Sequence, residues 1–195
     1  MSGGRQRLRI IGGAWRGRKL SFPDLPGLRP TPDRVRETLF NWLRDIIPGA
    51  RCLDLFAGSG ALGVEALSRG ADQAVLVDCH PAVIAQLHGH LQTLQAQGAT
   101  VVQADAVAYL QGPPQPFDVI FLDPPFGSGL LSPCLALLAE RGWVAAPAWL
   151  YLEADHRTPL PPLPPGWQVL RRGKAGQVGY YLLKCGTAAG QGSTP

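Results

Sequence analysis

Residues 51–63 read RCLDLFAGSGALG, a short apolar run followed directly by a glycine-rich turn. The run from Arg51 to Phe56 predicts a buried strand, and the residues from Ala61 to Ser68 predict a helix that stops at Gly70. Glycines placed directly after a strand let the backbone approach a ligand closely at the carboxyl edge of a parallel sheet. This stretch therefore predicts an α/β sheet with a ligand site where one of its strands ends.

Strand and helix patterns alternate on both sides of this turn, which is typical of a doubly wound parallel sheet. Asp33 is expected to cap a helix that ends before Pro48-Gly49, and Pro81 is expected at the first position of a helix that reaches Leu94. The other expected elements are strands at 74–77, 100–103, 117–122 and 150–153 and a helix at 131–141. The fold class predicted from these patterns is α/β.

Two hairpins are expected outside the alternating region. Strands at 167–171 and 178–184 should close the sheet, with residues 173–176 at their tip, and residues 9–20 should form a small β-hairpin that turns at Gly12-Gly13. The expected organisation is a basic N-terminal extension over residues 1–32, one α/β domain over 33–185 and a disordered tail over 186–195.

Length and composition limit the class of protein. A chain of 195 residues with 46% hydrophobic residues can bury the core of one domain. No apolar stretch reaches the roughly 18 residues of a membrane span, and the Arg-rich N-terminus has no apolar h-region, so a cytoplasmic protein without a membrane partner is expected. A small domain with a basic face could work as a monomer, which is the expected state. Four well-separated cysteines without a Cys-x-x-Cys pair, together with scattered histidines, indicate reduced, buried thiols and no metal site.

Positive charge is concentrated near the N-terminus, where residues 1–36 hold nine Lys and Arg against two Asp. The rest of the chain holds nine Lys and Arg against twelve Asp and Glu, so the net charge of +4 comes from this segment. A basic segment on a slightly acidic body indicates contact with a polyanion, because neutralised phosphates release condensed counterions. The alternative is a charged face that is only solvated.

The glycine turn alone does not identify its ligand. The spacing from Gly58 to Gly63 also fits the Gly-x-Gly-x-x-Gly pattern of dinucleotide-binding proteins. Asp54 argues against a pyrophosphate, since a carboxylate repels an anion and attracts a cationic sulfonium or amino group. Asp78 and Asp105 follow the next two strands, where acidic side chains commonly bind ribose hydroxyls, although a strand-end cap is the structural alternative.

Residues 117–126, FDVIFLDPPF, form the second motif. An apolar strand delivers Asp123, Pro124, Pro125 and Phe126 to the same sheet edge, and two prolines stiffen the loop. The exocyclic amine of a base is a poor nucleophile, so it needs hydrogen-bond acceptors and a clamped geometry. Asp123 and the carbonyl of Pro124 could each accept one N–H, while Phe126 stacks on the extruded base. A simple turn after a strand is the alternative interpretation.

These residues resemble the class I methyltransferases that carry an Asp/Asn-Pro-Pro-Phe/Tyr motif, and more narrowly the bacterial RsmD family. The matching segments are 8–13 (LRIIGG), 15–20 (WRGRKL), 28–31 (LRPT), 33–43 (DRVRETLFNWL), 54–63 (DLFAGSGALG), 123–126 (DPPF) and 175–178 (AGQV). The resemblance implies a Rossmann-like sheet of seven strands with the last strand antiparallel. It also implies that S-adenosyl-L-methionine is the cofactor and that the substrate is N2 of a guanine in 16S ribosomal RNA or in a small-subunit particle.

The resemblance also assigns roles to individual positions. The catalytic set is Asp123, Pro124, Pro125 and Phe126. The cofactor-binding set is Asp54, Phe56, Ala57, Gly58, Ser59, Gly60, Asp78, Asp105 and Ala106, with Thr31 and Arg36 from a segment expected near both cofactor and RNA. The RNA-binding set is Arg16, Arg18, Lys19, Arg29 and Arg34. The family often has Glu at position 78 and can have a neutral residue at 105, so those two contacts follow its pattern less closely.

Two other functions share part of this pattern. A DNA methyltransferase acting on adenine N6 or cytosine N4 would use the same acceptor geometry, and only the N-terminal resemblance argues against it. An RNA-binding assembly factor without catalysis could retain the fold, although the intact glycine turn and Asp-Pro-Pro-Phe motif argue against lost activity.

Overall fold

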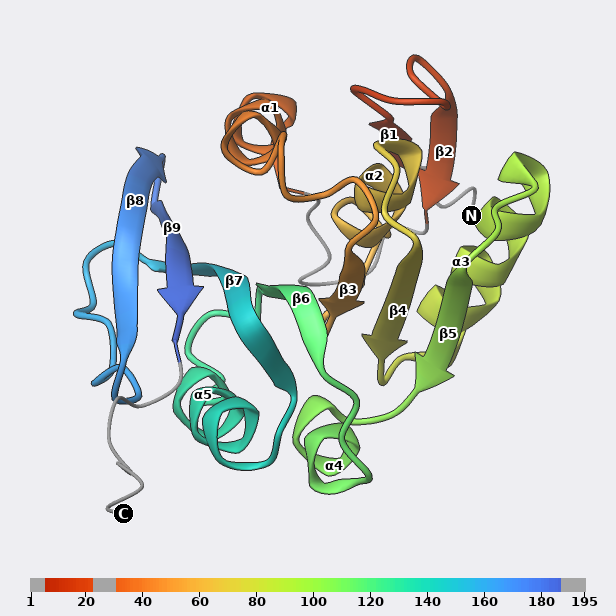
Figure 1. The fold of residues 1–195 in the computed structure, drawn as a ribbon. Coiled ribbons are helices and arrows are strands. Elements are labelled where there is room, and N and C mark those ends of the chain that lie inside the picture. The colour runs from red at the N-terminus through yellow and green to blue at the C-terminus, as the bar shows by residue number, and fades with distance from the viewer. Residues whose placement is uncertain (1–5, 23–30, 187–195) are drawn as a thin grey trace.

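One mixed sheet of seven strands runs through the molecule (Figure 1). The computed structural model describes residues 6–22 and 31–186. The strands are Arg51–Asp54 (β3), Gln73–Asp78 (β4), Ala99–Gln103 (β5), Phe117–Leu122 (β6), Val144–Asp155 (β7), Trp167–Ala175 (β8) and Val178–Cys185 (β9). Their order is β5-β4-β3-β6-β7-β9-β8, and only β9 runs antiparallel to its neighbours. The expected α/β sheet with an antiparallel last strand is confirmed.

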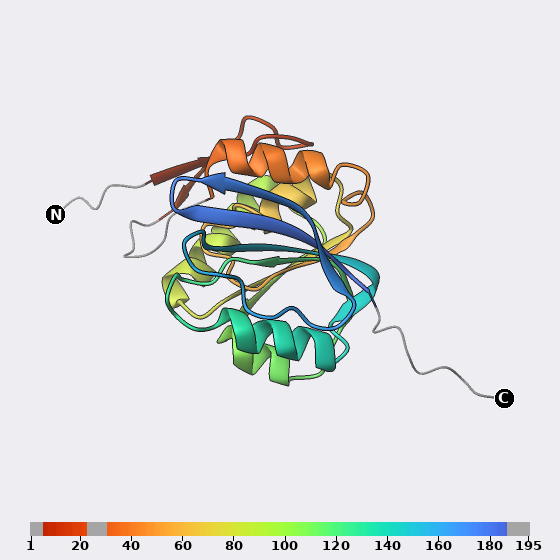
Figure 2. The ribbon, with the colours of Figure 1, turned by 90° about the vertical axis from the view of Figure 1, so that its left-hand side faces the viewer.

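Helices cover both faces of this sheet, which divides the core in two. Asp33–Trp42 (α1), Gly63–Ser68 (α2) and Pro81–Leu94 (α3) pack on one face, and Ala106–Gln111 (α4) and Leu131–Glu140 (α5) pack on the other (Figure 2). Side chains alternate along β6, so Val119 and Phe121 join the first core while Ile120 and Leu122 join the second. No helix among the described residues is long and apolar enough to cross a membrane.

The starts of the helices follow local chemistry that the sequence shows only in part. Pro81 occupies the first turn of α3 as expected, and His80 caps that helix by accepting the N–H of Ala82. Pro32, not Asp33, is the N-cap residue of α1, because the Asp33 carboxylate instead binds Arg36 at 2.6 Å. The expected cap at Asp33 is therefore wrong.

Three other parts of the fold differ from what the sequence predicted. Helix α4 was not expected, since six residues are too few to show helical periodicity. Strand β7 extends well beyond the expected 150–153, because Val144 pairs with β6 before the segment of low strand propensity, Ala145 to Pro147, and Ala148 and Trp149 pair with β9 and β6 directly after it. The turn of the C-terminal hairpin is at Gly176-Gln177, so 173–175 belong to β8.

The N-terminal hairpin is confirmed, with a longer connection than expected. Gln6–Arg9 (β1) and Lys19–Phe22 (β2) pair antiparallel, and residues 10–18 join them. This connection lies on α2, where Ala14 donates its N–H to the Ser68 carbonyl at 2.7 Å. Gly13 has φ +76°, and a Cβ there would lie 1.7 Å from that same carbonyl oxygen. Only glycine allows the connection to approach α2 this closely.

The cysteines are free thiols, and three of the four are buried as expected. Cys79 is exposed instead, because it lies just past the end of β4. The expected tail lies almost entirely outside the described residues, as do Arg29 and residues 1–5 of the basic N-terminal extension.

Candidate active site

Three carboxylates meet where β3, β6 and β7 end. Asp54 is the last residue of β3, Asp123 directly follows β6, and Glu153 lies near the end of β7. Asp54 pairs with Phe121 and Leu122 pairs with Leu152, so the three acids occupy neighbouring positions at one sheet edge. Alternation places all three on the sheet face that α1 and α2 cover. The edge therefore concentrates negative charge.

Asp54 stabilises the glycine turn through a hydrogen bond from the start of α2. Its side chain is 2% exposed, and its Oδ2 accepts the N–H of Gly63 at 2.9 Å. Burial, with a smaller contribution from Asp78, raises the pKa of Asp54 to about 7, while N–H donors from Gly63 and Phe56 oppose the rise. A cation bound beside Asp54 would favour its ionised form.

Asp78 holds the same turn from the next strand. Its two carboxylate oxygens accept the N–H groups of Gly58, at 3.0 Å, and His80, at 2.9 Å. Gly60 has φ +81°, and a Cβ there would lie 2.9 Å from the Leu87 side chain, so the turn depends on glycine. Ala57 and Ser59 are buried within it, and Phe56 is half-buried.

Asp105 is the N-cap residue of α4. Its Oδ1 accepts the N–H groups of Val107, at 2.9 Å, and Ala108, at 3.0 Å. The structural alternative therefore applies to Asp105, and its exposed carboxylate still has a second oxygen that accepts no hydrogen bond from the described residues. Ala106 is buried behind it.

The Asp-Pro-Pro-Phe segment lies open to solvent on one side. Asp123 is half-buried, Pro124 is buried, and Pro125 and Phe126 are exposed, with 48% of Phe126 accessible. Burial of the carboxyl raises the pKa of Asp123 well above its usual range, and the negative charges of Glu153 and then Asp54 add to that rise. An acceptor group thus lies next to an exposed aromatic ring.

Glu153 was not singled out from the sequence. It is 4% exposed, and its Oε1 accepts the hydroxyls of Thr31, at 2.9 Å, and Tyr151, at 2.8 Å. Burial raises the pKa of Glu153, and these two donors oppose that rise. An acid at the end of the otherwise apolar Leu150–Leu152 run was the available signal. Thr31 therefore contacts the carboxylate edge from outside the sheet.

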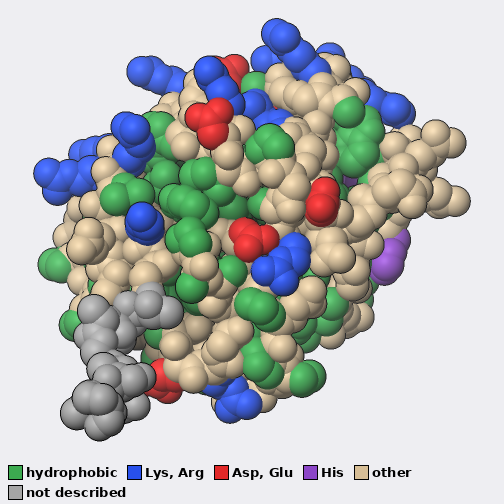
Figure 3. Space-filling model, viewed as in Figure 1, with side chains coloured by type: hydrophobic (Ala, Val, Ile, Leu, Met, Phe, Trp, Pro, Cys, Tyr) green, Lys and Arg blue, Asp and Glu red, His purple; other side chains and the backbone are tan. Residues whose placement is uncertain are grey.

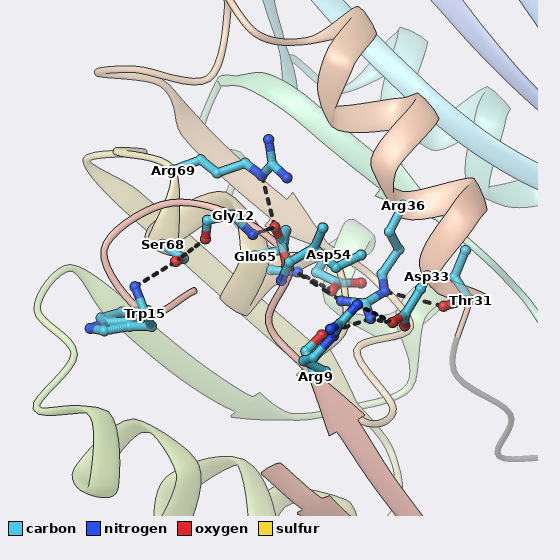
Figure 4. Close-up of polar contacts among 12 residues, drawn as sticks. Arg9, Gly12, Trp15, Thr31, Asp33, Arg36, Asp54, Glu65, Ser68 and Arg69 are labelled. Carbon is cyan, nitrogen blue, oxygen red and sulfur yellow. Dashed lines mark hydrogen bonds and ion pairs between the residues drawn. The ribbon is translucent and has the colours of Figure 1, made fainter. Parts of the chain in front are cut away.

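Arg36 lies in a second, fully paired cluster (Figure 4). It is 0% exposed, and its guanidinium donates to the carbonyls of Arg9 and Thr31 as well as to Asp33. Its Nη1 also lies 3.4 Å from Glu65. These contacts tie the N-terminal hairpin to α1 and α2, and the expected cofactor contact of Arg36 stays a prediction.

Glu65 is the centre of that cluster and was also missed. Its side chain is 1% exposed and accepts the N–H groups of Ile11 and Gly12 at 2.9 and 2.7 Å. Arg69 donates to it at 2.8 Å. A glutamate within the otherwise apolar and small-residue helix 63–68 was the only sequence signal.

The basic residues proposed to contact RNA are exposed on the hairpin and on α1. Arg16, Arg18, Lys19 and Arg34 are all exposed, and none forms an ion pair with another described residue. Arg18 donates to the Thr93 carbonyl at 3.2 Å, which docks the hairpin on α3. A surface groove of about 690 Å³ lies between β2 and α3, with Lys19 among its lining residues.

The edge fits a ligand that is cationic near Asp54 and carries hydroxyls near Asp78. A pyrophosphate at the same turn would face two carboxylates, and the N–H of Gly63 at the start of α2 already binds Asp54. The donor set therefore fits a sulfonium nucleoside better than a dinucleotide. No group of His, Cys, Asp and Glu residues suited to a metal occurs in the described ranges.

Comparison with known proteins identifies relatives along nearly the whole chain. A family model described as conserved hypothetical protein 95 matches residues 8–184. The ribosomal RNA small subunit methyltransferase D of Escherichia coli K12 is 52% identical over 181 residues, covering 93% of this chain and 91% of the relative. The protein of the same name from Haemophilus influenzae is 45% identical, covering 91% and 93%.

Solved structures give the same picture. A putative methyltransferase, yhhF, from Escherichia coli superposes with a TM-score of 0.85 at 49% identity, covering 93% of this chain and 99% of that one. An RNA methyltransferase from Salinibacter ruber, in complex with S-adenosyl-L-homocysteine, superposes with a TM-score of 0.64 at 15% identity, covering 86% and 100%. The second likeness is one of fold.

Proposed function

We propose, because this chain belongs to the RsmD family of ribosomal RNA small subunit methyltransferases, that it methylates the exocyclic N2 amine of a guanine in 16S ribosomal RNA. The methyl donor is S-adenosyl-L-methionine. The observation that carries the proposal is the position of Asp123 to Phe126 at the sheet edge that also holds the glycine turn.

The residues around the glycine turn would hold the cofactor. Asp54 to Gly60 would contact its methionine part, Asp78 its ribose, and Asp105 with Ala106 its adenine. The bound cofactor supplies a methyl group activated by the adjacent sulfonium. The buried carboxylate of Asp54 favours positive charge there, which suits this donor and no anionic one.

The Asp-Pro-Pro-Phe loop would hold the target amine. Asp123 and the Pro124 carbonyl accept its two N–H groups, which orients the nitrogen lone pair toward the methyl group. Phe126, exposed beside them, stacks on the flipped base and offsets part of the few kcal/mol that extrusion costs.

The Asp123 carboxylate would also accept the proton that the reaction releases. The nitrogen gains a carbon and must lose one hydrogen, and an ionised Asp123 already accepts that N–H. Its raised pKa makes it a better proton acceptor than an exposed aspartate. The reaction therefore needs Asp123 ionised at the start.

Nucleoside analysis tests the substrate. Small subunits and, in a parallel reaction, genomic DNA from cells that lack this protein are incubated with the protein and labelled S-adenosylmethionine, and the label is expected in N2-methylguanosine of the ribosomal RNA. Label in DNA alone would favour the amino-methyltransferase of adenine or cytosine. Failure to bind S-adenosylmethionine in calorimetry would favour the non-catalytic assembly factor.

A further inference from the structure

Strand β8 carries three cations within four residues, Arg171, Arg172 and Lys174. β8 is the outermost strand at one edge of the sheet, and all three side chains are exposed. Lysines on an edge strand can simply prevent pairing with another chain, so the cluster needs a second observation before it indicates a ligand.

The strand register supplies that observation. Gly173 pairs with Tyr180, and Tyr180 pairs with Glu153, so the three residues lie in one row across β8, β9 and β7. Arg172 and Lys174 flank Gly173 along the strand, level with the carboxylate edge but on the sheet face opposite to that of Glu153, while Arg171 lies on the same face as Gly173. Neighbouring strands are about 4.8 Å apart, so the backbone of Glu153 on β7 lies only about 10 Å from that of Gly173 on β8.

The charges of this cluster are not used inside the protein. Buried or half-buried cations elsewhere have acidic partners, such as Arg51 with Asp118 and Arg69 with Glu65. Arg171, Arg172 and Lys174 pair with no acid among the described residues. Adjacent like charges repel one another, and an external polyanion relieves that repulsion.

The N-terminal hairpin supplies cations on the opposite side of the site. It docks on α3, which packs over β4 and β5, whereas β8 lies at the far edge beyond β7 and β9. In Figure 3, Lys and Arg side chains gather over the hairpin, α1 and the β8–β9 end of the sheet. Asp123, directly after the central strand β6, therefore lies between two basic regions.

We propose that Arg171, Arg172 and Lys174 form a second RNA-binding arm, which contacts phosphates of the RNA on the side of the target base opposite the N-terminal hairpin. This inference rests on the proposed function and adds a binding surface to it. RNA is the partner because its regular phosphate charge matches two separated basic regions, and its flipped base enters between them.

The test uses the full chain and a charge-matched control. Arg172→Glu/Lys174→Glu reverses one Arg and one Lys on β8, and Arg141→Glu/Lys184→Glu makes the same change elsewhere. Both control residues are exposed, but Arg141 ends α5 just before β7 begins, and Lys184 pairs with Trp149, so both lie toward the amino edge of the sheet. Binding of protein-free 16S transcript is measured at several salt concentrations.

The β8 variant is expected to bind about 10- to 100-fold more weakly than the control, with a salt slope smaller by about 2. S-adenosylmethionine binding by calorimetry should be equal in both variants, which shows that the fold is intact. Equal RNA affinity in the two variants, whether high or low, would overturn the proposal. A wild-type protein that makes no N2-methylguanosine while the β8 effect persists would instead reject only the proposed function.

Discussion

Two clusters of buried acid lie close together in this molecule and differ in how their charge is balanced. Glu65 has Arg36 and Arg69 as partners and accepts two backbone N–H groups. Asp54 and Asp123, at the sheet edge, have no cationic partner among the described residues. The first cluster is complete within the protein and fastens the hairpin, whereas the second is left for a ligand to complete.

The largest effect should follow removal of the acceptor at the edge. Asp123→Ala is expected to lower kcat by at least about 10³-fold, because the amine loses both its orientation and its proton acceptor. Calorimetry should show S-adenosylmethionine binding largely retained. Asp123→Asn is the matched control, since it keeps one acceptor oxygen and the side-chain shape but loses the charge and the proton acceptor. Turnover near wild type in Asp123→Ala would remove Asp123 from the mechanism.

The paired cluster should respond in stability instead. Glu65→Ala removes one of the two acidic partners of buried Arg36, removes the partner of Arg69 and frees two backbone N–H groups, so the free energy of unfolding should fall by about 3–5 kcal/mol. Denaturant titration measures the loss. Glu65→Gln keeps one oxygen for the N–H groups and should lose less. A Glu65→Ala protein as stable as wild type would contradict the fastening role.

The pKa of Asp54, raised to about 7, makes cofactor binding depend on pH. Below about pH 7 the carboxyl is protonated in the free protein, and a nearby sulfonium favours its ionised form. Affinity for S-adenosylmethionine should therefore rise as the pH rises toward 7 and level off above it, with a proton released on binding. Calorimetry in buffers of different ionisation enthalpy measures that proton.

S-adenosylhomocysteine, which has no sulfonium charge, is the matched ligand and should release less of a proton. The variant Asp54→Asn should release none from this site. Equal proton release by the wild type and Asp54→Asn would show that the proton released on cofactor binding does not come from Asp54.

The smallest expected effect is a shift in the pH profile. Burial, then the like charge on Glu153 and on Asp54, raises the pKa of Asp123, and Tyr151 also faces this region. Glu153→Gln removes that charge, so the pKa of Asp123 falls and the acid limb of kcat should move to lower pH. Single-turnover rates across pH measure the shift. Glu140→Gln, at the end of α5, is the control, and an unmoved limb in Glu153→Gln would show that the two acids do not interact.

Much of the site was predictable because the positions of its residues follow from local sequence patterns. Asp54, Asp78 and Asp123 each end a strand or directly follow one, and parallel strands bring their carboxyl ends to one edge. Asp105 shows the limit of such reasoning, because the same position also begins α4, and its carboxylate caps that helix. Local sequence placed Asp105 correctly after its strand, but it did not determine which group the carboxylate binds.

Sequence alone determined the α/β class, most strand and helix positions, the glycine turn and the Asp-Pro-Pro-Phe loop, since each depends on residues that are neighbours along the chain. The tertiary structure alone decided which acids are paired and which are not. Arg36 and Glu65 are 29 residues apart, and Thr31 and Glu153 are 122 apart. Such contacts depend on how helices and strands pack, and no local pattern encodes that packing. The balance of charge around Asp123 therefore follows from the fold.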